Sequence, residues 1–94
     1  MSEYEGMLLM NAELDEEGVS AIKHRLEGII TGGSGELASW EGWGRKRLAS
    51  KAKGRTEAVY VLFDFRGDGK IVSELRRVCG LSENVLRCMF LRKH

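Results

Sequence analysis

The sequence predicts one α+β domain in which four strands and two helices follow each other in the order βαββαβ. Two segments repeat apolar residues at helical spacing, and four others are apolar stretches typical of strands. The chain has 94 residues, a length that buries one core and cannot be divided into two stable ones. We therefore treat residues 1–94 as a single domain.

The first strand is expected at residues 4–10, a short apolar stretch bounded by acidic residues. Asp15 begins the first helix, because Asp15, Glu16 and Glu17 suit the positive end of a helix dipole. Residues 32–35 contain three glycines and end this helix, since glycine tolerates the left-handed conformation found just past helix ends. The apolar stripe of the helix consists of Val19, Ile22, Leu26, Ile29 and Ile30.

The second half of the chain continues with strands expected at residues 37–52 and 59–65, joined by a turn at residues 54–57. A second helix follows, with Gly80 as its C-terminal stop, and residues 85–91 form the last strand. Each helix links two strands that end up parallel through a right-handed crossover. This order specifies a ferredoxin-like sandwich: one four-stranded sheet with both helices on one face. The apolar positions of the second helix are Ile71, Val72, Leu75, Val78 and Cys79.

Both faces of this sheet are predicted to carry apolar side chains. In the third strand Val61 and Phe63 share one parity, while Tyr60 and Leu62 share the other. Two helices cover only one face, and a solvated second face normally alternates more cleanly between apolar and polar residues. One interpretation is that a partner covers the second face. The other is that central strands are often apolar on both faces and that part of this surface is only modestly exposed.

Charge is separated along the chain although the net charge is only +1. Residues 1–17 contain six acidic and no basic residues: Glu3, Glu5, Glu13, Asp15, Glu16 and Glu17. Residues 45–55 contain six basic and no acidic residues: Arg45, Lys46, Arg47, Lys51, Lys53 and Arg55. A second basic group closes the chain: Arg87, Arg92, Lys93 and His94.

The basic segment 45–55 predicts a contact with a polyanion. If it continues as a strand, alternation places one set of cations on one side, away from Leu48, Ser50 and Ala52. A cationic ridge of this kind suits a phosphate backbone, whereas the alternative is a solvated hairpin. Trp43 lies just before the segment and is able to stack on a base or to pack against the fold. The predicted ridge consists of Arg45, Arg47, Lys51, Lys53 and Arg55.

Other kinds of site are not indicated. No catalytic set of nucleophile and base stands out, and no cysteine spacing predicts a metal. Cys79 and Cys88 fall in apolar segments, where cysteine behaves as a small buried hydrophobe. The start of the chain lacks the features of a secretory signal, and no apolar run is long enough for a membrane span. We expect an intracellular protein with no catalytic activity, cofactor, metal or small-molecule substrate.

Four stretches of the chain resemble the small-subunit ribosomal protein S-six family. They are Tyr4 and Glu5 in the first strand, residues 43–49 in the second, residues 60–62 in the third and residues 84–89 in the fourth. Residues 43–49, WGRKRLA, are similar to the family's Gly-Arg-Arg-x-Leu-Ala stretch, although Ser50 and Lys51 replace a common Tyr-Pro. The resemblance implies a ferredoxin-like fold, and it implies binding to the central domain of small-subunit ribosomal RNA together with ribosomal protein S-eighteen.

On this basis we expect a non-enzymatic structural component of the ribosome, in the bacterial cytoplasm or in an organelle. The alternative is a dimeric ferredoxin-like regulatory or interaction module without RNA binding. An RNA-recognition motif shares the fold, but the third strand lacks its basic residue, glycine and spaced aromatics. An acylphosphatase-like enzyme needs a glycine-rich anion loop after the first strand, which is missing. The residues expected to contact RNA are Tyr4, Trp43, Arg45, Lys46, Arg47, Lys51, Lys53, Arg55, Arg87, Arg92 and Lys93.

Overall fold

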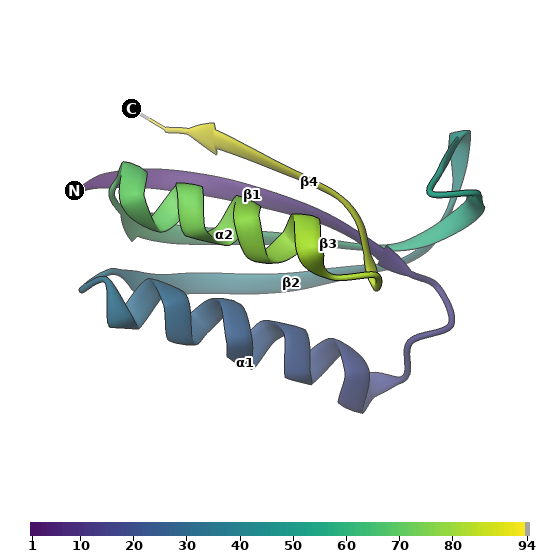
Figure 1. The fold of residues 1–94 in the computed structure, drawn as a ribbon, viewed down its shortest axis with the longest axis horizontal. Coiled ribbons are helices and arrows are strands. Elements are labelled where there is room, and N and C mark those ends of the chain that lie inside the picture. The colour runs from purple at the N-terminus through teal and green to yellow at the C-terminus, as the bar shows by residue number, and fades with distance from the viewer. Residues whose placement is uncertain (94) are drawn as a thin grey trace.

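The computed structural model describes residues 1–93 and contains six elements in the expected order (Figure 1). His94, part of the predicted C-terminal basic group, lies outside the described residues. The elements are β1 (Ser2–Asn11), α1 (Glu16–Gly32), β2 (Glu36–Ala52), β3 (Arg55–Gly67), α2 (Gly69–Leu81) and β4 (Val85–Arg92).

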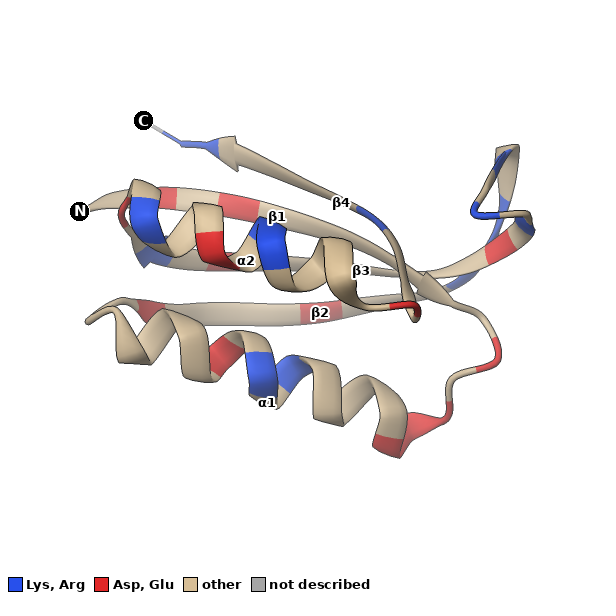
Figure 2. Ribbon diagram, viewed as in Figure 1, with Lys and Arg blue, Asp and Glu red and all other residues tan. Residues whose placement is uncertain are grey.

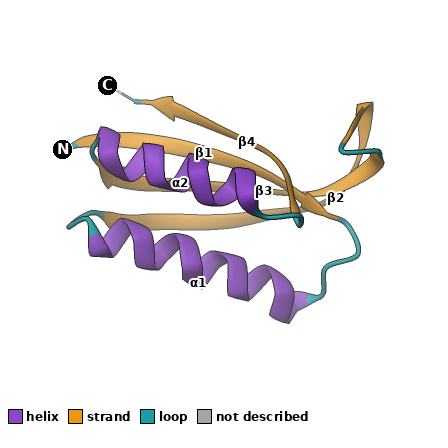
Figure 3. Cartoon of the chain, viewed as in Figure 1, coloured by secondary structure: helices purple, strands orange, loops and turns teal. Residues whose placement is uncertain are grey.

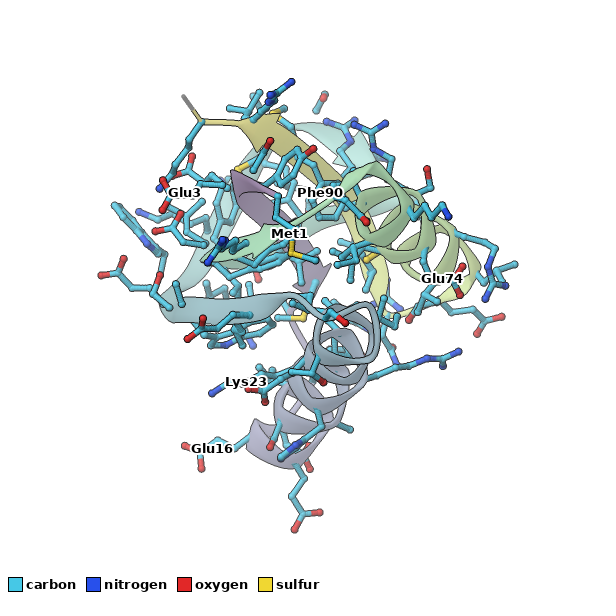
Figure 4. The ribbon with its side chains drawn as sticks, turned by 90° about the vertical axis from the view of Figure 1, so that its left-hand side faces the viewer. Met1, Glu3, Glu16, Lys23, Glu74 and Phe90 are labelled. Atoms are coloured by element: carbon cyan, nitrogen blue, oxygen red, sulfur yellow. The ribbon has the colours of Figure 1, made fainter. Side chains whose placement is uncertain are left out.

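The four strands form one sheet in the order β2-β3-β1-β4, and every neighbouring pair is antiparallel. The strands that each helix connects, β1 with β2 and β3 with β4, therefore run parallel without being neighbours. Both helices cover the same face of the sheet and lie side by side (Figures 3 and 4). The predicted ferredoxin-like sandwich is confirmed. No helix within residues 1–93 has the length and apolar character needed to cross a membrane.

Aspartate caps begin both helices. The Asp15 carboxylate accepts a hydrogen bond from the Gly18 N–H at 2.8 Å, and Asp68 accepts one from Ile71 at 3.0 Å. The predictions at the helix ends are partly wrong. The left-handed residue after α1 is Ser34, with φ 67°, rather than a glycine, and Gly80 lies inside α2, which is capped by Ser82.

The core between the sheet and the helices is built around three phenylalanines. Phe63 and Phe65 stack with 5.6 Å between their ring centroids, and Phe90 meets both edge-on. Figure 4 shows Phe90 on the side of the sheet that carries the helices. Gly6 pairs with Phe63 across the β1–β3 ladder, and a Cβ at Gly6 would overlap the Phe63 ring. The Phe63 ring therefore fits in this position because Gly6 has no side chain.

The other face of the sheet, which we call the outer face, carries a small second cluster of buried residues: Leu9, Ala52, Ala58 and Leu86. Leu48 and Tyr60 pack against it and are partly buried. Residues from the β2–β3 hairpin thus cover one end of this face. On β4, Met89 and Leu91 point to the same face and remain 51% and 55% exposed. The prediction of apolar residues on both faces is confirmed.

The β2–β3 hairpin turns at Lys53 and Gly54, where both residues have positive φ, 48° and 77°. Ala52 pairs with Arg55 across this two-residue loop. Two positive values in succession define a type I′ turn, whose twist matches that of the flanking strands. The turn predicted at residues 54–57 is therefore wrong in position, because β3 already begins at Arg55.

Candidate RNA-binding surface

The basic hairpin, residues 45–55, projects from the end of the sheet opposite to both chain termini (Figure 1). In Figure 2 its lysines and arginines gather at this end, with acidic residues of β3 and of the β1–α1 loop close by. Every cation of the hairpin is exposed to solvent. The hairpin is thus the strongest concentration of accessible positive charge that the described chain offers.

The predicted ridge is only partly formed. Arg45, Lys46 and Arg47 pair with Val59, Ala58 and Glu57, so Arg45 and Arg47 share one face and Lys46 lies on the other. Between Arg47 and Ala52 the register shifts, and alternation no longer orders the side chains. The prediction that five cations share one strand face is therefore wrong, although Leu48 and Ala52 do lie on the same side, as expected, in the cluster on the outer face.

Two arginines of the basic hairpin are engaged by the rest of the protein. Arg45 donates a hydrogen bond to the Ala12 carbonyl at 2.9 Å and lies 3.5 Å from the Glu57 carboxylate. Arg55 lies 3.7 Å from the Glu13 carboxylate. Both ion pairs are at the surface, where water and salt weaken them and where a phosphate is able to compete. In the free protein these two arginines are partly neutralised.

Lys53 is engaged in a different way. Its ammonium group donates to the carbonyl oxygens of Ser82 and Val85, at 3.2 and 2.8 Å. Ser82 lies in the connection between α2 and β4, and Val85 is the first residue of β4. Lys53 therefore has a structural role in holding the turn of the hairpin against this connection.

Four of the predicted cations near the hairpin have no such partner among the described residues, and neither has Arg92 at the other end of the sheet. Within residues 1–93, no hydrogen bond or ion pair from a side chain holds Lys46, Arg47, Lys51 or Arg87. Arg87 lies on β4 opposite Leu9, at the end of the outer face that the hairpin approaches. These four residues form what we call the unpaired cation set.

Three predicted residues lie far from the hairpin. Arg92 pairs with Tyr4 across β1 and β4, whereas Arg87 pairs with Leu9, about 17 Å further along the strand. Tyr4 stacks on Phe65 with 5.4 Å between ring centroids and packs against the main core. Lys93 lies 2.7 Å from the Asp64 carboxylate. Tyr4, Arg92 and Lys93 therefore lie apart from the basic hairpin.

The two tryptophans of β2 have different environments. Trp40 packs against the main core, with 5.4 Å between its ring centroid and that of Phe63, and the Lys23 ammonium lies 5.9 Å from its ring. Trp43 is 53% exposed and belongs to neither buried cluster. The structure thus separates a packing tryptophan from one that is available to a ligand.

Sequence reasoning missed the acidic residues that neutralise the hairpin. The segment 45–55 contains no acid, but Glu57 comes from the paired strand and Glu13 from the β1–α1 loop. A regular ladder from the turn at residues 53–54 would place Glu57 opposite Ser50, and only the register shift between Arg47 and Ala52 brings it opposite Arg47. Glu13 depends on how the loop packs, which no local pattern reveals. Within residues 1–93, no group of three or more His, Cys, Asp or Glu side chains is placed to hold a metal ion.

Comparison with known proteins agrees with this architecture. Residues 3–92 match the family described as "Ribosomal protein S6", the S-six family named above. Small ribosomal subunit protein bS6 of Syntrophomonas wolfei is 39% identical over 94 residues, covering 99% of this chain and 97% of the relative. The same protein of Clostridium acetobutylicum is 33% identical over 91 residues, covering 97% and 96%.

A solved structure extends the agreement to the fold. The crystal structure of 30S ribosomal protein S6 from Thermotoga maritima superposes with a TM-score of 0.87 at 25% identity, covering 98% of this chain and 87% of that one. The family is a structural, non-enzymatic part of the small subunit of bacterial, cytoplasmic ribosomes. These matches cover nearly every residue described above, so the chain belongs to the ribosomal protein S6 family of the bacterial small ribosomal subunit.

Proposed function

We propose that this single domain binds the central domain of small-subunit ribosomal RNA together with ribosomal protein S-eighteen. The observation that carries the RNA part is the unpaired cation set at the hairpin end of the sheet: Lys46, Arg47, Lys51 and Arg87. Each cation that meets a phosphate releases condensed counterions, which gives affinity and makes it depend on salt. Family membership supports the proposal, because the relatives are components of the small ribosomal subunit.

Within this interface the cations have unequal roles. The unpaired cation set supplies phosphate contacts without giving up an existing partner. Arg45 and Arg55 contact phosphate only by exchanging Glu57 and Glu13 for it. Lys53 holds the turn, and the far positions of Tyr4, Arg92 and Lys93 leave them out of this contact.

Salt dependence tests the RNA part. The double variant Arg47→Ala with Lys51→Ala should bind the ribosomal RNA fragment more weakly and reduce the slope of log affinity against log salt by about 0.7–0.9 for each lost phosphate contact. The matched control is Lys70→Ala, which removes an exposed cation from α2, on the helix side of the sheet. An unchanged slope in the double variant, or an equal change in the control, would exclude these residues from the interface.

The protein part rests on the outer face. Met89 and Leu91 are exposed there, and Leu91 pairs with Glu5 on β1, next to Glu3 and the Asp64–Lys93 ion pair. The hydrogen bond with Asp64 raises the pKa of Lys93, and the charges of Asp64, Glu5 and Glu3 act in the same direction. Figure 4 shows Glu3 on the side of the sheet away from the helices. An apolar strip beside acidic residues suits a small basic protein such as S-eighteen.

Hydrogen exchange tests the protein part. Addition of S-eighteen should slow exchange of β3 and β4 amides. The variant Met89→Glu, which places a charge in the apolar strip, should abolish this effect and leave the fold intact because Met89 is exposed. Met1→Glu, at a comparably exposed methionine near the N-terminus, is the control. Unaltered exchange in the presence of S-eighteen would contradict the proposed partnership, and a stable homodimer in sedimentation would favour the regulatory-module alternative.

A further inference from the structure

Trp43 has no structural role that the described residues reveal, and we propose that it stacks on an unpaired base of the ribosomal RNA. This inference rests on the proposed RNA binding and names a ligand chemistry for one residue of that surface. Trp43 is 53% exposed, and within residues 1–93 its ring stacks on no other aromatic ring. The fold therefore leaves a large apolar face of the indole in water.

The backbone around Trp43 leaves room for a flat ligand. The β2–β3 register shifts between Gly42 and Gly44, so Trp43 is the extra residue of a bulge, a feature that redirects a side chain out of the regular ladder. Gly44 has φ 80°, and a Cβ built at Gly42 or Gly44 would meet nothing within 4 Å. The indole is flanked on both sides along the chain by residues without side chains.

Trp40, three residues earlier, shows what a structural tryptophan looks like in the same strand. It is partly buried, packs on Phe63 and is covered by Lys23. Neither kind of contact exists for Trp43 among the described residues. The contrast removes packing as the reason for an aromatic residue at this position.

The neighbours of Trp43 favour RNA over a protein as the occupant. Arg45, Lys46 and Arg47 follow two to four residues later, about 7–13 Å along the strand. A cationic track beside an aromatic platform is the arrangement that binds single-stranded nucleic acid, with the base on the ring and its phosphates on the cations. The base must be unpaired, since bases in an RNA helix have both faces covered by their neighbours.

The apolar strip proposed for the protein partner lies elsewhere. Met89 and Leu91 belong to β4, while Trp43 belongs to β2, at the opposite edge of the sheet. With two strands between them, the two edges are roughly 14 Å apart. Trp43 therefore stands outside the exposed apolar surface that a protein partner would cover.

Affinity measurements provide the first test, in the presence of S-eighteen and the central-domain RNA fragment. Trp43→Ala should weaken RNA binding by about five- to 150-fold, the range of a lost aromatic stacking contact, without changing the salt slope. Trp43→Phe should bind nearly as well as the original chain, because phenylalanine also stacks. Equal affinity for all three proteins, or equal losses in both variants, would overturn the inference.

Fluorine NMR of the full chain labelled with 5-fluorotryptophan provides the second test, because Trp40 and Trp43 give separate signals that Trp43→Phe assigns. The Trp43 signal should move when RNA is added to the complex with S-eighteen, and the Trp40 signal should stay nearly fixed. A Trp43 signal that moves fully with S-eighteen alone would assign the contact to protein and overturn the inference.

The two tests separate this inference from the proposed function. If the chain and S-eighteen fail to bind the RNA at all, both proposals are overturned. If the RNA binds with the predicted dependence on Arg47 and Lys51 while Trp43→Ala has no effect, the proposed function stands and the stacking inference alone is overturned. Circular dichroism of each variant shows whether the fold is intact, as expected for a change at an exposed side chain.

Discussion

The Lys53 ammonium group lies 2.8 Å from the carbonyl oxygen of Val85, which ties the turn of the basic hairpin to the first residue of β4. A second hydrogen bond, to the Ser82 carbonyl, strengthens the same link. Although Lys53 belongs to a segment rich in cations, its ammonium group helps to hold the folded structure together.

Replacement of Lys53 by methionine keeps most of the aliphatic stem and removes the donor. We expect faster hydrogen exchange in residues 47–57 and a loss of roughly 0.5–1.5 kcal/mol in the free energy of unfolding, as for a lost hydrogen bond. The control is Lys51→Met, which has no partner to lose within residues 1–93. Equal exchange in the two variants would show that the link to Val85 does not order the hairpin.

The acids that face the hairpin should weaken RNA binding. Glu13→Gln and Glu57→Gln release Arg55 and Arg45 from their ion pairs, so RNA affinity should rise at low salt and the difference should shrink at high salt. Stability should change by less than about 1 kcal/mol, because exposed ion pairs contribute little. Glu27→Gln on α1 removes the same charge from another face and serves as the control; an equal gain there would indicate only a general effect of net charge.

Gly6 should tolerate no side chain. In the variant Gly6→Ala the new methyl group overlaps the Phe63 ring, which lies in the core and must shift. We expect a loss of about 1–3 kcal/mol in the free energy of unfolding, typical of an overpacked core. Gly28→Ala, at an exposed helical position with nothing within 4 Å, should instead stabilise by roughly 0.5–1 kcal/mol. Denaturant unfolding of both variants measures the two opposite effects, and a stable Gly6→Ala protein would mean that the ring moves freely.

Burial raises the pKa of the Cys79 thiol to about 12, and the neighbouring Cys88 acts in the same direction. The folded state therefore holds the proton more tightly than the unfolded state, so stability should fall as pH rises above 9.0, the ordinary pKa of the thiol, toward 12. Cys79→Ala should lessen this fall, which unfolding curves at pH 8, 9.5 and 10.5 would measure, with Cys88→Ala for comparison. At pH 8 the Cys79 thiol should also resist alkylation until the protein unfolds; rapid modification of the native protein would contradict its burial.

The order of elements and the fold were predictable because the apolar periods are long and clear. The stripe from Val19 to Ile30 and the run from Val59 to Phe65 leave little choice between helix and strand. The errors occur where several residue types satisfy the same geometry. Ser34 takes the left-handed position beside three glycines. Lys53 takes the first position of the I′ turn, where its hydrogen bonds to Ser82 and Val85 outweigh the small preference for asparagine, aspartate or glycine.

The site was predictable as a region and less so as a set of side chains. Charge density located the basic hairpin, since six cations cannot be buried. Strand alternation failed beyond Arg47 because a register shift is invisible to a pattern of period two. The environment of Tyr4 was not predictable, because an aromatic residue beside acids has the same local pattern whether it stacks on Phe65 or on a base.

The hairpin is anchored on two sides, by Arg45 and Arg55 to the β1–α1 loop and by Lys53 to the α2–β4 connection. Its direction is consequently set when the chain folds, before any nucleic acid arrives. Binding to a surface that is already ordered costs less conformational entropy than binding to a flexible hairpin that becomes ordered only in the complex. The anchoring of three cations thus holds the hairpin that carries the remaining ones in a fixed arrangement, as the RNA contact proposed above requires.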